Sequence, residues 1–534
     1  MKNNRSTYIK NILIPCLCFS VITGGVTGIF LFLFKAAASR ITSLSAYIYG
    51  LARQTPLLLP CLIAGAALLG LIAALILKKT HNCRGGGIPT SIALLRGLIP
   101  FNWLHSIFYL FASTMLTFFC GVPLGNEGPS VQMGTAVGRG TVRIFGRKNQ
   151  AWDRYIMTGG ACAGFASATG APISGIFFAF EEAHRRFSPM IFMTASSAVI
   201  ASTATTRILC ELTNTKYALF GFDLNAVLPM KYLWVPLAVG VVCGICAIFF
   251  TKIYRFFGEL INGYLRKIPF VLKTVFIFVL VSILGFISAD FIGSGHDLIE
   301  AVFEGHGMWA MLILCLCVRG ILLITANQVG VTGGLFVPSL TFGAIIGGLC
   351  GKGIISLGFL PEAHYGLMVA IGMVSFLSAS SRTPITAITF AIEALCGLAN
   401  ILPVAIGVTF SFLVIETSGT AAFTESVIEN RVEKQHRGKT ALTVDAILTV
   451  KKGSFVVGKE IRDILWPPTC VVTSVKKNNG HSFATMEEGD VLTLHYKTYD
   501  PASSSEALEA LLGKQESSAF SSIVTKTAAD VPGI

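Results

Sequence analysis

Apolar segments close to the thickness of a lipid bilayer recur along most of this 534-residue chain. Clear examples are residues 57–77, 103–120, 233–250, 271–289 and 308–324. A helix needs about 20 residues to cross the hydrocarbon core. Hydrophobic residues make up 53% of the chain and charged residues only 13%, whereas soluble domains carry about a quarter charged residues. The sequence therefore predicts an all-α polytopic membrane protein.

Other apolar segments are short or interrupted by glycine and proline, namely residues 88–98, 172–180 and 338–349. Half-length pieces of this kind are typical of folds with broken helices and a binding site at the membrane midplane. The layout suggests a membrane domain over residues 1–436 with two halves, about 8–211 and 229–436. The halves show negligible sequence identity by eye, so an inverted repeat is a hypothesis from layout alone.

The charges favour a cytoplasmic N-terminus. The first ten residues carry Lys2, Arg5 and Lys10 and no acid, as expected for a segment that stays inside. The apolar stretch 12–34 lacks a suitably placed cleavage site, so we expect a retained helix and not a signal peptide. The net charge of +13 is spread over loops and the tail. Without a basic patch interleaved with aromatic residues, we expect no nucleic-acid partner.

Three segments share one design, in which glycines precede a proline and a helix. They read GGGIP at residues 85–89, GNEGP at 125–129 and GGLFVP at 333–338. Glycines let backbone N–H groups approach a ligand, proline starts a helix without losing a donor, and each helix start carries a partial positive charge. One such segment alone would be an ordinary helix break, but three in one chain favour an anion site built from helix ends.

Acidic residues occur at two places, inside the segment GNEGP and at residues 181–182. Glu127 of GNEGP is expected at a buried helix start, at a cost of roughly 2.5–3.5 kcal/mol at membrane depth. There it would compete with anions for the same N–H groups, so we interpret Glu127 as a gate. The pair Glu181-Glu182 ends an apolar run and precedes Arg185-Arg186. This pair fits either interfacial ion pairing or proton transfer.

On these motifs, residues 8–436 resemble the CLC family of chloride channels and chloride/proton antiporters. The family signatures GSGIP, GREGP and GxFxP correspond to GGGIP, GNEGP and GLFVP here, and the segment that ends in Glu181-Glu182 also matches. The resemblance implies a homodimer in the cell membrane of a prokaryote, with both termini cytoplasmic. It implies one anion pathway per subunit, bound chloride or another halide, and no other cofactor, metal or catalytic residue.

The resemblance assigns roles to individual residues. Glu127 matches the external gating glutamate. Glu182 matches the internal proton-transfer glutamate, which favours chloride/proton antiport over a passive channel. The positions expected to hold the anion are Gly86, Gly87, Ile88, Phe336 and Val337.

The chain departs from the family pattern at three positions. Gly86 stands where a serine is expected, no tyrosine lies near Phe423 or Thr424, and Asn126 replaces an arginine. We therefore expect a central site with backbone donors alone. The fluoride-exporting branch also departs at the serine and the tyrosine. A fluoride/proton antiporter and a passive voltage- or ligand-regulated chloride channel remain alternatives.

The C-terminal part differs in composition from the membrane domain. Residues 441–498 predict a small cytoplasmic α/β unit, with strands at 454–457, 470–476 and 491–496 and a helix at 459–465. This unit resembles the TrkA-C (RCK-C) regulatory domain, which implies either a dimer brace or a site for a small-molecule ligand. Residues 499–534 are expected to form a short helix and a tail. The chain shows no HExxH motif, nucleophile elbow or Walker loop, so we expect no enzyme.

Overall fold

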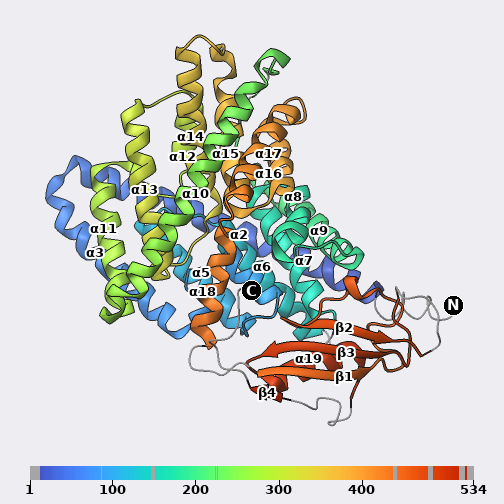
Figure 1. Ribbon diagram of the computed structural model, residues 1–534. Helices are drawn as coiled ribbons and strands as arrows, with labels where there is room; N and C mark the ends of the chain where they lie inside the picture. The colour runs from blue at the N-terminus through green and yellow to red at the C-terminus, as the bar shows by residue number, and fades with distance from the viewer. Residues whose placement is uncertain are drawn as a thin grey trace.

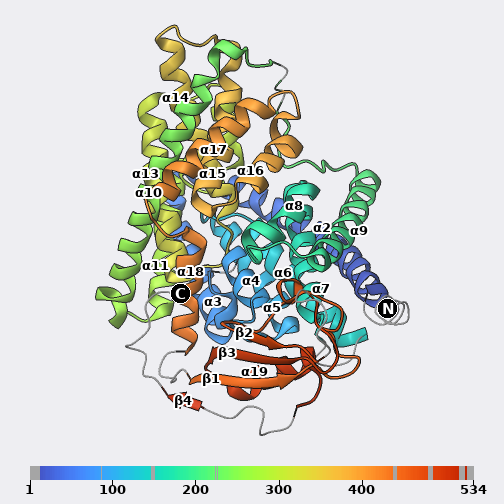
Figure 2. The same cartoon turned by 45° about the vertical axis from the view of Figure 1, so that its right-hand side comes forward.

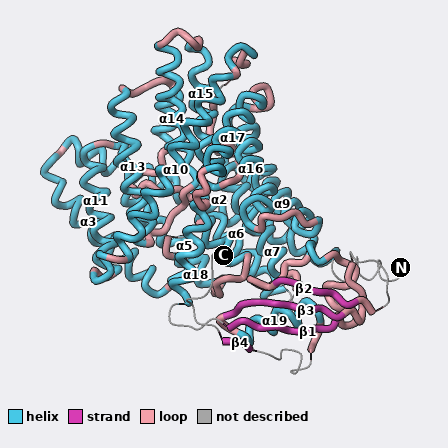
Figure 3. Tube along the Cα trace, in the orientation of Figure 1, coloured by secondary structure: helices cyan, strands magenta, loops and turns pink. Residues whose placement is uncertain are grey.

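The computed structural model describes residues 13–85, 87–145, 151–222, 224, 226–436, 442–478, 485–515 and 523–525. Most of this part is helical, with one small sheet near the C-terminus (Figure 1, Figure 3). Eight of the described helices are long and apolar enough to cross a bilayer. The chain is therefore a multi-pass membrane protein.

The helices follow one another with short connections. In the first half they are α2 (Ile14–Gln54), α3 (Leu59–Lys79), α4 (Ile88–Leu95), α5 (Trp103–Cys120), α6 (Glu127–Phe145), α7 (Asp153–Thr169), α8 (Pro172–Phe178) and α9 (Pro189–Thr213). The later ones are α10 (Trp234–Asn262), α11 (Phe270–Ile287), α12 (His296–Phe303), α13 (Trp309–Val329), α14 (Phe336–Ser356), α15 (Tyr365–Ser381), α16 (Pro384–Ala391), α17 (Ile401–Thr417) and α18 (Phe423–His436). Two π-turns, η4 (Ala179–Ala183) and η9 (Ile392–Cys396), extend α8 and α16.

The predicted spans correspond to α3, α5, α10, α11 and α13. Two of the three predicted half-length segments form short helices, α4 and α8. The third prediction was wrong, because residues 338–349 lie inside α14, which has 21 residues. Its glycines Gly343 and Gly347 do not break the helix. They let α14 approach the backbone of α15 at Gly372.

The two halves repeat the same packing. In the first half α6 packs on α7, and α2 packs on α7 and α9. In the second half α14 packs on α15, and α10 packs on α15 and α17. The short helices α8 and α16 contact each other where the halves meet (Figure 2). This pattern fits the repeat suggested by the layout.

The C-terminal unit is a four-stranded antiparallel sheet of order β2-β3-β1-β4 below the helices (Figure 1). Its elements are β1 (Leu442–Thr449), β2 (Val471–Lys476), β3 (Val491–Thr498), α19 (Pro501–Leu512) and β4 (Ile523–Thr525). Helix α19 packs on β1 and buries three leucines. Helix α19 confirms the short helix expected after residue 498, whereas β4 comes from the segment expected to be a tail.

Two of the three predicted strands in this unit are confirmed, as β2 and β3. The strand at 454–457 was wrong, because Gly453 and Gly458 have positive φ angles of 70° and 78° and turn the chain on both sides of it. The helix at 459–465 was also wrong, since only a 3-10 turn forms there, at Ile461–Asp463. Strand β1 was not predicted.

Candidate functional site

The three glycine-rich segments meet at one point, as the sequence predicts. Gly125 N–H donates to Gly334 O at 2.8 Å and Gly334 N–H donates to Gly125 O at 2.7 Å. Gly128 lies against both neighbours, because a Cβ there would lie 2.7 Å from Gly334 Cα and 2.8 Å from Gly87 Cα. A side chain at this position would collide with backbone on two sides. The reciprocal hydrogen bonds join a segment of the first half to the corresponding segment of the second.

Helices α4, α6 and α14 start at this meeting point, each with a proline in its first turn. The first N–H groups of a helix have no acceptor within the helix. Those of Ile88, Phe336 and Val337 therefore have no acceptor within their own helices. Gly87 differs, since its N–H donates to Oε1 of Gln132 at 3.1 Å. Gly86 lies outside the described residues.

Glu127 is the first residue of α6 and is fully buried. The N–H groups of Glu127 itself and of Val337 face its carboxylate. Within the described part of the chain, neither carboxylate oxygen accepts a hydrogen bond of normal geometry. A Cβ at Gly125 would collide with this carboxylate. Lys35 of α2 adds a favourable charge, so the carboxylate lies among helix-start amides and one cation.

A cavity of about 30 Å³ lies at the starts of α4 and α14. Gly87, Ile88 and Phe336 line it, together with Glu182. A water molecule needs roughly 10–15 Å³ of such space, so the cavity accommodates a water or a small anion. Six residues with hydroxyl groups also line it, namely Ser339, Ser380, Ser381, Thr383, Thr386 and Thr424. These hydroxyls come from elements distant in sequence and line the cavity together with the expected backbone donors.

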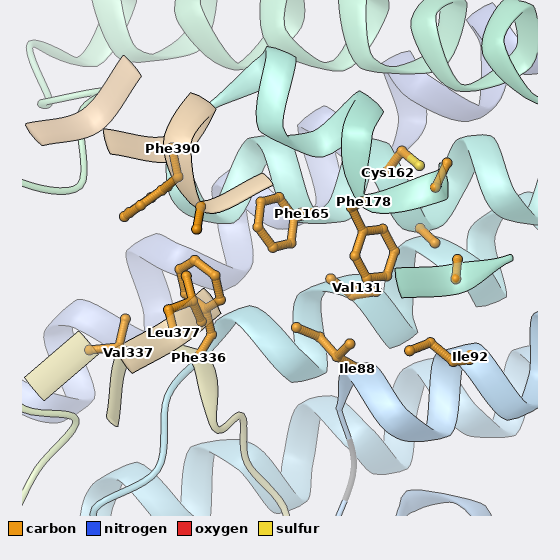
Figure 4. Packing of buried hydrophobic residues seen from close by; sticks show 14 of the residues in the cluster. Ile88, Ile92, Val131, Cys162, Phe165, Phe178, Phe336, Val337, Leu377 and Phe390 are labelled. Atoms are coloured by element: carbon orange, nitrogen blue, oxygen red, sulfur yellow. The ribbon is translucent and has the colours of Figure 1, made fainter. Parts of the chain in front are cut away.

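Aromatic rings form one wall of this region (Figure 4). The ring of Phe336 makes edge contacts with Phe165 and Phe390, at centroid distances of 5.2 and 5.3 Å. Phe165 stacks on Phe178 at 5.5 Å. Phe165 and Phe336 also line the cavity, so its wall is partly aromatic.

The two glutamates at the end of α8 have different environments. Glu182 is 7% exposed and lines the cavity. Glu181 points to the other half, where its carboxylate accepts from Ile385 N–H at 2.8 Å and from Thr386 N–H at 2.7 Å. Glu181 therefore caps the start of α16 and leaves Glu182 as the carboxylate at the cavity.

Glu393 makes the reciprocal contact, which the sequence reading missed. Its carboxylate accepts from Ile173 N–H at 2.7 Å and from Ser174 N–H at 2.9 Å, at the start of α8. The signal was present in the chain. The segment from Pro172 to Glu181 reads PISGIFFAFE, and the one ending in Glu393 reads PITAITFAIE. Each half thus caps the short helix of the other.

The C-terminal unit contacts the same region through Arg154 at the start of α7. Nη1 of Arg154 donates to the carbonyls of Leu465 at 3.1 Å and Trp466 at 2.8 Å. Its Nε donates to the carbonyl of Leu95 at 2.7 Å, at the end of α4. One arginine therefore connects the C-terminal unit to a helix whose other end lines the cavity.

Three solved structures share this fold. A slow cyanobacterial Cl⁻/H⁺ antiporter is 23% identical over 79% of this chain and 99% of its own, with a TM-score of 0.72. A eukaryotic CLC transporter is 18% identical over 78% of this chain and 74% of its own, with a TM-score of 0.65. A CLC-type fluoride/proton antiporter is 18% identical over 76% of this chain and 96% of its own, with a TM-score of 0.63.

Sequence comparison covers the same region. Residues 69–416 match the family model described as "voltage gated chloride channel". This match spans more than half of the chain and includes the glycine-rich segments and the paired glutamates, while the C-terminal unit lies outside it. The chain therefore belongs to the CLC family, whose members are transporters or channels.

Proposed function

We propose that this protein is a secondary active antiporter that exchanges chloride for protons across the membrane. The observation that carries the proposal is the position of Glu127. Its buried carboxylate lies at the start of α6 and faces the N–H of Val337 on α14. When ionised, it occupies the place where an anion would meet helix-start amides. When protonated, it is neutral and no longer competes for them.

The second carboxylate, Glu182, supports coupling to protons. It lines the same cavity as Ile88 and Phe336. A carboxylate repels anions and is costly to bury in a membrane. A buried carboxylate at this cavity would hinder a passive anion channel, whereas it can carry protons in an antiporter. Two carboxylates along one path give protons a route in and out of the same region.

The test is flux in proteoliposomes that contain the purified protein. A chloride gradient should drive protons in the opposite direction. Glu127→Ala should abolish proton movement while chloride still passes. The control is Glu362→Gln, an exposed carboxylate before α15, which should behave as wild type. Wild-type chloride flux that moves no protons would leave a passive channel instead.

Fluoride is the second candidate substrate. The cavity is small and lined by hydroxyl groups, a surface that also suits a small, strongly hydrated anion. One protein of the same fold is a fluoride/proton antiporter. The same vesicles, given equal gradients of chloride and fluoride, decide between the two ions by which gradient drives protons faster.

We also propose a homodimer. Large apolar side chains stand exposed on α8, α9, α16 and α17, from both halves of the chain: Ile173, Ile200, Ile208, Leu212, Ile385 and Leu402. A second copy of the chain would cover this face. Subunit counting by single-molecule photobleaching in lipid should give two subunits per particle, and one subunit would refute the dimer.

The C-terminal unit is proposed to be a cytoplasmic regulatory domain that acts on transport, either as a dimer brace or through a small ligand. The contact of Arg154 with Leu465, Trp466 and Leu95 supports this role. A chain that ends near residue 440 should transport at a clearly different rate from the full-length protein. Equal rates would show that the unit has no influence on transport.

A further inference from the structure

Four charged side chains gather around the π-turn that follows α8. They are Arg96 at the end of α4, Glu182 and Arg185 after α8, and Glu425 in the first turn of α18. Glu425 Oε1 accepts from Arg96 Nη1 at 2.9 Å and lies 3.2 Å from Arg185 Nη2. Glu425 therefore pairs with both arginines.

Arg96 stays beside Glu182 independently of that pair. Its Nε donates to the carbonyl of Ala183 at 2.9 Å and its Nη2 donates to the carbonyl of Glu182 at 3.1 Å. These two hydrogen bonds fix the guanidinium at the π-turn. Arg96, Arg185, Glu181 and Glu425 are the charged groups that act on the Glu182 carboxylate.

The two other carboxylates in this set have different tasks. Glu181 is committed to capping α16 through Ile385 and Thr386. Glu425 lies at a helix start, where the backbone favours a negative charge, and it directly follows Thr424, which lines the cavity. Glu425 is thus the carboxylate placed to offset the charge of Arg96 and Arg185.

We propose that Glu425 is a positioning residue for proton transfer, which takes up the charge of the two arginines so that Glu182 can bind and release a proton. The proposal rests on the antiport function proposed above. Without Glu425, the charges of Arg96 and Arg185 would act on Glu182 with no offsetting carboxylate from α18. An opposite charge within about 4–6 Å favours the ionised form of a carboxyl group, so Glu182 would then hold a proton only at lower pH.

The test variant is Glu425→Gln, which keeps the size of the side chain and one acceptor oxygen but removes the charge. Chloride-driven proton transport is measured in proteoliposomes over a range of internal and external pH. The pH of half-maximal proton transport should move down by about one unit, the lower end of the range for a nearby charge. At neutral pH, proton flux should fall several-fold relative to chloride flux.

The matched control is Glu429→Gln, an exposed glutamate one turn along the same helix, which should leave the pH profile unchanged. A second variant separates charge from structure. Glu425→Gln combined with Arg185→Gln restores the net charge around Glu182, so the pH profile should return toward that of wild type. If Glu425 served only to hold α18 against Arg96 and Arg185, proton transport in the double variant would be at least as impaired as in Glu425→Gln.

The outcomes are distinct. If wild type couples chloride to protons but Glu425→Gln has the wild-type pH profile, this inference is overturned and the antiport function stands. If the double variant shows no recovery, the charge argument is overturned as well. If wild type itself moves no protons, the antiport function fails and this inference fails with it.

Discussion

At the scale of single residues, the site depends most on Gly128. A Cβ at this position would approach the Cα atoms of Gly334 and Gly87 within 2.8 Å. Both contacts are backbone, which cannot move aside as a flexible side chain can. Overpacking typically costs about 1–3 kcal/mol, and here the strain falls on the helix starts themselves. We expect Gly128→Ala to lower the thermal midpoint of the purified protein and to reduce chloride flux at least tenfold.

The control for Gly128→Ala is Gly320→Ala in α13, where an added Cβ meets nothing within 4 Å. Alanine is favoured over glycine inside a helix by roughly 0.5–1 kcal/mol. Gly320→Ala should therefore leave flux intact and keep or raise the thermal midpoint. Full activity in Gly128→Ala would mean that the three segments are less tightly joined than the hydrogen bonds between Gly125 and Gly334 indicate.

Lys459, in the C-terminal unit, gives this unit a pH dependence. It is 6% exposed, and its Nζ lies 2.8 Å from the ring centroid of Phe455. Burial lowers the pKa of Lys459 from 10.5 to about 6, against the opposing effects of Cys16 and Asp463. Between about pH 6 and pH 10 the amine should therefore be neutral in the folded unit and charged in the unfolded chain. Because the unfolded state binds more protons, stability rises with pH between about 6 and 10.

Pulse proteolysis of the full-length protein in urea measures this effect at the C-terminal unit. The unfolding midpoint of wild type should rise between about pH 6.5 and pH 8.5. Lys459→Met removes the titrating group and should flatten that rise. A variant with the same pH slope as wild type would show that other groups set it.

At the scale of elements, the short helices α8 and α16 are held by each other's half of the chain. Glu181 caps α16 and Glu393 caps α8. Loss of a cap typically costs about 1 kcal/mol. Glu181→Ala and Glu393→Ala should each lower the thermal midpoint by a similar amount. Unequal effects, with one variant at the wild-type midpoint, would contradict the symmetry of the two caps.

The short helices also show which parts of the fold the sequence predicts. Prolines mark the starts of α4, α8 and α16. The sequence predicted short apolar segments at the first two of these positions, which form α4 and α8. The segments PISGIFFAFE and PITAITFAIE are similar to each other, whereas the two halves differ almost everywhere else. The glycines of α14 suggested a break, whereas they serve close packing against α15. Sequence alone does not separate these two uses of glycine.

At the scale of the whole molecule, the site is made of segments more than 200 residues apart, as the bridge between Gly125 and Gly334 shows. The sequence predicted each glycine-rich segment and the two carboxylates, but the hydroxyl lining of the cavity needed the fold. Thr424 and Ser380 follow no motif and reach the cavity only because α15 and α18 end or begin there. The role of Glu425 also depends on the fold, because its partners Arg96 and Arg185 are distant from it in sequence.

Coupled transport has one consequence that a passive pore cannot imitate. In a planar bilayer with the purified protein and a chloride gradient, the reversal potential should differ from the equilibrium potential of chloride. It should also move when the pH on one side is changed at constant chloride. In Glu127→Ala, where the gating carboxylate is absent, the reversal potential should return to the chloride equilibrium value. A wild-type reversal potential that stays at the chloride equilibrium value at every pH gradient would contradict proton-coupled exchange through Glu127.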